Sequence, residues 1–114
     1  MIINGVELEN LDIYDLEVAE RYEKAMSRIS DIQGEVGNLD GAEGIRKICT
    51  GIFEVFNTMF GEGADKKIFG NRVNLLTCLK ALEEFQLQIK DQKKEIEKLA
   101  NKYSPNRAVR RSKK

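Results

Sequence analysis

Three groups of residues in the sequence have types and spacings that could carry chemistry. The first is Gly61–Gly63 followed by Lys66 and Lys67, since glycines and lysines bind phosphate in nucleotide-binding loops. Such a loop has the spacing GxxxxGK[ST] between a buried strand and a helix. Here a helical pattern precedes the glycines and isoleucine follows the lysines. We therefore interpret this stretch as a break between two helices.

The second and third groups are the cysteines and a pair of acidic residues. Cys49 and Cys78 form no CxxC pair, and each falls in an apolar helical pattern, so we expect two small core residues in a reducing compartment. Asp40 and Glu43 lack the ligand pattern of a calcium loop and fit a helix N-cap with its capping-box partner. Histidine, the commonest acid–base group and metal ligand, is absent from the sequence. The sequence therefore predicts a protein that is not an enzyme and uses no metal or cofactor.

The C-terminal segment Asn106–Lys114 has a strong charge bias. The chain carries 19 basic and 19 acidic residues, but its last 14 residues hold six basic and no acidic ones, so the remainder is acidic. After the helix-stopping Pro105 we expect this tail to be disordered when free. It could serve only solubility, dock an acidic protein, or bind nucleic acid weakly and in a salt-dependent manner. Its candidate binding residues are Arg107, Arg110, Arg111, Lys113 and Lys114.

The elements that position these residues are predicted to be helical after a short N-terminal hairpin. Asn4-Gly5, flanked by apolar residues on both sides, is a strong signal for a two-residue turn and predicts a hairpin over residues 1–9. Apolar residues then recur at helical spacing in three stretches. These stretches predict helices over residues 12–33, 41–60 and 72–103.

The predicted helix ends rest on capping residues and glycines. Asp12, Asp40 and Asn71 have side chains favoured at N-caps and are expected to begin the three helices. Gly34 is expected to end the first helix, and Gly61 to end the second.

The second predicted helix is expected to be the most buried, because two of its faces are apolar. Gly51 within it costs about 1 kcal/mol relative to alanine, which favours a close helix crossing at that point. After this helix, Ala64–Phe69 could form one further helical turn whose Ile68 and Phe69 fill the core.

The third predicted helix is roughly 48 Å long, which is longer than the other elements can cover. From Leu82 onward it carries a heptad seam with Gln92 as the one polar position. An apolar stripe that continues past its own domain needs a partner, either a second copy or a helix of another protein. For Phe85, packing against the first helix is an equally good interpretation. The residues predicted to contact the partner are Leu82, Phe85, Ile89, Ile96, Leu99 and Tyr103.

The sequence therefore predicts a single, mainly α domain over residues 1–105, with a short N-terminal β-hairpin and a disordered basic tail over residues 106–114. No stretch reaches the roughly 18 uncharged apolar residues of a membrane span, so we expect no membrane contact. The N-terminus also lacks the basic and apolar regions of a secretory signal. We expect a cytoplasmic protein.

The stretch FGEGADKKIFGNRVNLLTCLKALEEF (residues 60–85) and the terminal NRAVRRSKK resemble the small tail assembly chaperone-type proteins of siphophages and prophages in Gram-positive bacteria. The layout of a short strand segment before a compact helical body is similar too. The resemblance implies a helical protein in the cytoplasm of the bacterial host. It implies as partners the tape measure protein, a long and largely helical chain, and the tail tube proteins that assemble around it.

Three functions are consistent with these features. The first is a phage morphogenesis chaperone that binds a helical client through apolar helix faces and associates into a homo-oligomer, for which the hairpin edge offers a further pairing surface. The second is a small nucleic-acid-associated phage regulator that acts through its basic tail. The third is a phage-encoded inhibitor that blocks a host defence protein by surface binding.

Overall fold

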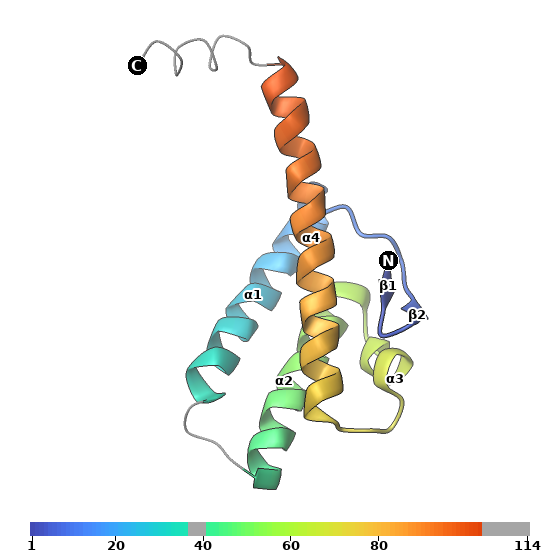
Figure 1. The fold of residues 1–114 in the computed structure, drawn as a ribbon, viewed down its shortest axis with the longest axis vertical. Coiled ribbons are helices and arrows are strands. Elements are labelled where there is room, and N and C mark those ends of the chain that lie inside the picture. The colour runs from blue at the N-terminus through green and yellow to red at the C-terminus, as the bar shows by residue number, and fades with distance from the viewer. Residues whose placement is uncertain (37–40, 104–114) are drawn as a thin grey trace.

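The computed structural model describes residues 1–36 and 41–103, which form a mainly helical body with one long helix extending from it (Figure 1). The predicted fold class is confirmed. The expected N-cap Asp40 and the basic tail over residues 106–114 lie outside the described residues. In chain order the elements are β1 (Ile2–Ile3), β2 (Val6–Glu7), α1 (Leu16–Val36), α2 (Gly41–Phe60), α3 (Ala64–Phe69) and α4 (Leu75–Tyr103).

The N-terminal hairpin turns at the predicted dipeptide. Asn4 and Gly5 have φ angles of 53° and 76°, and positive values at both positions are what a type I′ turn requires. β1 and β2 pair antiparallel, with Ile3 opposite Val6. Ile3 is fully buried because β1 packs on α4, so the helical body stabilises a hairpin that would be marginal alone.

The first helix begins later and ends later than predicted. Asp12 does not cap it, because its side chain closes a separate turn in which Oδ1 accepts a hydrogen bond from the Tyr14 amide at 2.9 Å. The carbonyl of Asp15 accepts the first helical hydrogen bond, so α1 begins at Leu16. The helix then continues through Gly34, which weakens a helix but ends one only where the chain turns left-handed.

The last helix also begins three residues after its predicted start. The side-chain oxygen of Asn74, not that of Asn71, accepts the Thr77 amide at 3.0 Å, which is the hydrogen bond of an N-cap. α4 therefore begins at Leu75. Its 29 residues correspond to about 43 Å, and they form the longest element of the described chain.

The core lies where α2 meets the other helices. The α2 residues Ile52, Val55 and Phe56 are completely buried, as the apolar faces of this helix predict. The Phe56 ring makes edge-on contacts with Phe69 of α3 and Phe85 of α4, at centroid distances of 5.7 and 5.8 Å. Such pairs add about 0.5–1.5 kcal/mol to the effect of burial. The predicted turn α3 thus fills the core through Phe69 and the buried Ile68.

The crossing of α1 and α2 is close at Gly51, as predicted. A Cβ atom at this position would lie 2.7 Å from both Cγ1 and Cδ1 of Ile32 on α1. Glycine is therefore needed for this approach, which explains its place inside a helix despite its low helix propensity.

The two cysteines are free and completely buried, which confirms the prediction that they are core residues. The fold brings them together, Cys49 from α2 and Cys78 from α4. Burial raises the pKa of the Cys78 thiol to about 12, and its hydrogen bond with the Cys49 thiol adds to the shift. The Cys78 group is therefore held as a neutral thiol between the helices.

Candidate functional site

The six residues predicted to contact a partner fall into two groups along α4. Phe85 and Ile89 are 0% and 1% exposed, and Leu82 is also buried. These three pack inside the chain's own core and do not form an accessible surface, which corrects the predicted extent of the stripe. The remaining three, Ile96, Leu99 and Tyr103, are 37%, 45% and 76% exposed.

The change from buried to exposed occurs at Gln92, the polar position of the heptad seam. Its Oε1 accepts a hydrogen bond from the Ile13 amide at 2.9 Å, and its Nε2 donates one to the Leu11 carbonyl at 2.7 Å. These bonds tie the segment between β2 and α1 to α4. Every α4 residue after Gln92 is exposed, and this part of the helix extends beyond the other elements (Figure 1). The projecting end, residues 93–103, is about 16 Å long.

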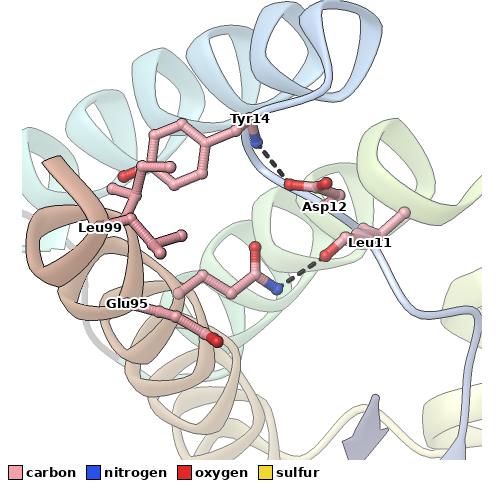
Figure 2. Close-up of a pocket in the computed structure, with 7 residues that line it drawn as sticks. Leu11, Asp12, Tyr14, Glu95 and Leu99 are labelled. Carbon is pink, nitrogen blue, oxygen red and sulfur yellow. Dashed lines mark hydrogen bonds between the residues drawn. The ribbon is translucent and has the colours of Figure 1, made fainter. Parts of the chain in front are cut away.

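A groove of about 340 Å³ lies between the projecting end and the segment before α1. Figure 2 shows the Tyr14 side chain reaching from this segment toward the part of α4 that carries Leu99, while the Asp12 carboxylate bonds back to the Tyr14 amide. The lining combines apolar side chains with two carboxylates. Its residues are Leu11, Asp12, Tyr14, Gln92, Glu95, Ile96 and Leu99.

The groove contains residues that the sequence analysis missed. Tyr14 lines the groove and is half-exposed. Leu16, at the first position of α1, does not line the groove but is 73% exposed. Neither residue lies at a position where apolar residues recur at helical spacing in the first predicted helix. The signal in the sequence that could have identified this site was Tyr14, an aromatic residue outside that spacing. Gln92 was recognised as polar, but its partners are about 80 residues away in the sequence.

One edge of the hairpin, along β1, is bonded to other elements of the same chain. Glu84 of α4 accepts a hydrogen bond from the Asn4 amide at 2.9 Å, and Gln88 Nε2 donates to the Ile2 carbonyl at 2.8 Å. The Asn4 side chain also donates to the Ile68 carbonyl of α3 at 2.9 Å. Side chains of α4 therefore bond to backbone groups of Ile2 and of the turn residue Asn4, so β1 does not offer a neighbouring copy a pairing edge. Pairing along the outer edge of β2 stays a prediction.

A second exposed apolar surface lies at the beginning of α4. Val73, Leu76 and Leu79 are all exposed there. A groove of about 310 Å³ joins Val73 to Ile45 and other residues of the first turns of α2. In this part of α4 the buried positions are Cys78, Ala81 and Leu82, so the leucines at positions 76 and 79 face away from the core.

Other kinds of site have little support in residues 1–36 and 41–103. No cluster of three or more histidine, cysteine, aspartate or glutamate side chains there has the geometry to hold a metal ion. Gly61 and Gly63 take left-handed conformations between α2 and α3, as expected for a helix break. No helix within the described residues is both long and apolar enough to cross a lipid bilayer.

The fold and its surface define a small helical protein whose last helix projects an apolar stripe beside a groove. The chain belongs to DUF6673, a family of unknown function whose model matches residues 4–114. Comparison with curated proteins gave no match, and neither did comparison with solved structures.

Proposed function

We propose that this protein is an assembly chaperone without enzymatic activity, which binds a helical client through the projecting end of α4. The observation that supports this function is the exposure of Ile96, Leu99 and Tyr103 at heptad spacing, beyond the point where the body covers α4. Apolar residues at this spacing match the face that one helix presents to another.

The groove beside this stripe determines how a client would lie. Tyr14 and Leu11 form one wall, and Ile96 and Leu99 form the other. An amphipathic client helix can place its apolar residues between these walls and keep its polar face in water. Gln92 keeps the walls in position, since its side chain fixes the segment that carries Tyr14.

The client we propose is the tape measure protein of a phage or prophage. Residues 60–85 and the terminal NRAVRRSKK resemble the tail assembly chaperone-type proteins of siphophages, and this resemblance implies a long helical client. Such a client exposes apolar helix faces until tail tube subunits surround it. The chaperone would act in the cytoplasm of the bacterial host and cover these faces during assembly.

The test is co-expression of this chain with the tape measure protein encoded by the same phage or prophage. We expect the soluble fraction of the tape measure protein to rise several-fold with the wild-type chain. The double variant Ile96→Asp with Leu99→Asp should abolish this effect, because charges on the stripe oppose its burial.

The matched control is Leu87→Asp. Leu87 is 53% exposed on the same helix and lies outside the heptad seam, so this charge should leave the soluble fraction high. Equal loss with the control and the stripe variant, or no solubilisation by the wild-type chain, would contradict the proposed function.

A further inference from the structure

We propose that a second copy of the chain occupies the stripe in the absence of a client, with the two projecting α4 ends paired antiparallel and Glu95 of each copy facing Lys102 of the other. The inference rests on the proposed function, because it names another partner for the same surface. It specifies a direction and a register, both of which follow from side chains on residues 92–103.

The register follows from the positions of the apolar residues. Three residues continue the heptad seam of α4: Ile96, Leu99 and Tyr103. Gln92 occupies the seam position immediately before Ile96. In an antiparallel pair, Ile96 of one copy packs against Leu99 of the other, and the reverse contact forms by two-fold symmetry. The same alignment places Tyr103 of each copy opposite Gln92 of the other.

The body of each copy sets the limit of the overlap. Leu11 and Ile13 are bonded to Gln92, so the segment before α1 meets α4 there and prevents a longer pairing. The groove between Tyr14 and Ile96 starts at this position and is large enough for an aromatic ring. Tyr103, the most exposed of the three stripe residues, would enter this groove from the second copy.

The charges beside the seam favour the antiparallel direction. Glu95 and Lys102 lie seven residues apart and therefore on the same side of the seam. Antiparallel helices bring these flanking positions together, which gives two Glu95–Lys102 pairs across the interface. Parallel helices would instead place Glu95 beside Ala100, where no charge is available.

The experiment is the dissociation constant of the full chain, measured from its molar mass by light scattering and sedimentation over a range of concentrations. Glu95→Lys and Lys102→Glu should each weaken the dimer roughly tenfold, because each turns two attractive pairs into two repulsive ones. The double variant carrying both changes should restore wild-type affinity. The control Glu97→Lys makes the same change in net charge away from the seam and should leave the affinity unchanged.

Three results would overturn the pairing: a wild-type chain that stays monomeric, single variants that dimerise like the wild type, or a double variant no tighter than the single ones. The co-expression assay reports separately on the proposed function. A monomeric chain that still solubilises the tape measure protein would reject only the self-pairing. A dimer with the predicted charge dependence but no effect on that client would reject only the chaperone role.

Discussion

Gln92 accepts a hydrogen bond from the backbone amide of Ile13 at 2.9 Å, and within the described residues no side chain of α4 beyond Gln92 makes a hydrogen bond to the body. The same side chain donates to the Leu11 carbonyl at 2.7 Å. One amide group thus satisfies a backbone donor and a backbone acceptor of a segment without regular structure. Its two bonds set the length of the projecting end and the position of Tyr14.

The substitution Gln92→Leu should lower the free energy of unfolding by about 1–3 kcal/mol, because the Ile13 amide and Leu11 carbonyl lose their partners in a half-buried place. Gln92→Glu keeps an acceptor for Ile13 but sets a carboxylate oxygen against the Leu11 carbonyl, so it should also destabilise the protein. Urea denaturation measures both changes. Asn101→Leu, at an exposed position of the same helix, is the control and should stay within about 0.5 kcal/mol of the wild type. If Gln92→Leu left the free energy of unfolding unchanged, the segment before α1 would be held by other contacts.

Two glycines in helices should respond to alanine in opposite directions. Gly51→Ala should destabilise the protein by about 1–3 kcal/mol, because its Cβ would overlap the Ile32 side chain. Gly34→Ala meets no atom within 4 Å and should stabilise it by about 0.5–1 kcal/mol through helix propensity. Thermal unfolding followed by circular dichroism gives both values. Adding Ile32→Ala should reduce the cost of Gly51→Ala, and additive effects would show that the two sites do not clash.

Two isoleucines at equivalent heptad positions on α4 should differ sharply in their tolerance of charge. Ile89→Asp places a carboxylate in the core and should cost at least about 4 kcal/mol, enough to unfold much of the protein. Ile96→Asp, beyond the body, should change stability by less than about 1 kcal/mol. Denaturant titration of both variants tests where the core ends, and similar losses would place Ile96 inside it.

Stability should decrease in alkaline solution because of the buried thiol pair. The pKa of Cys78 rises from its ordinary value of 9.0 to about 12, so the folded state keeps a proton that the unfolded state releases. This contribution is complete below pH 9 and is lost as the pH rises toward 12. The loss of this contribution should lower the free energy of unfolding by on the order of 2 kcal/mol at about pH 10.5. Burial also raises the pKa of Tyr22, which acts in the same direction.

The control for this pH dependence is Cys78→Ala, which removes the titrating thiol and leaves Tyr22 in place. Its free energy of unfolding should fall less steeply than that of the wild type above pH 9, as measured by urea denaturation at several pH values. Parallel curves for the two proteins would show that Cys78 does not titrate differently in the folded and unfolded states.

Local signals in the sequence predicted the hairpin, α2 and α3 well. The dipeptide Asn4-Gly5 strongly favours the observed turn, and the glycines after Phe60 favour a helix end at that residue. The starts of α1 and α4 were each missed by three or four residues. In both cases a second capping residue follows three positions later, Asp15 after Asp12 and Asn74 after Asn71. Residue type alone cannot choose between them, because packing decides which one is used.

The limits of the stripe could not be predicted for a different reason. The heptad seam continues from Ile89 to Ile96 with only the polar Gln92 between them. One polar seam position does not indicate that the first isoleucine is covered and the second exposed. Coverage depends on the segment from Leu11 to Tyr14, which is far from α4 in the sequence. Contacts between residues so far apart in the sequence produce no periodic pattern in it. The groove therefore could not be predicted from the sequence and is seen only in the folded structure.

The attachment of β1 to α4 has a consequence for synthesis on the ribosome. Asn4 and Ile2 leave the ribosome 80 and 86 residues before their respective partners, Glu84 and Gln88. At a translation rate of about 5–20 residues per second, the helix on which the hairpin packs is synthesised roughly 4–17 s after the hairpin. During that interval Ile3 cannot be buried, because α4 has not yet been made. The chain completes its fold only when translation reaches α4. In a nascent chain stalled before this helix, β1 therefore stays exposed.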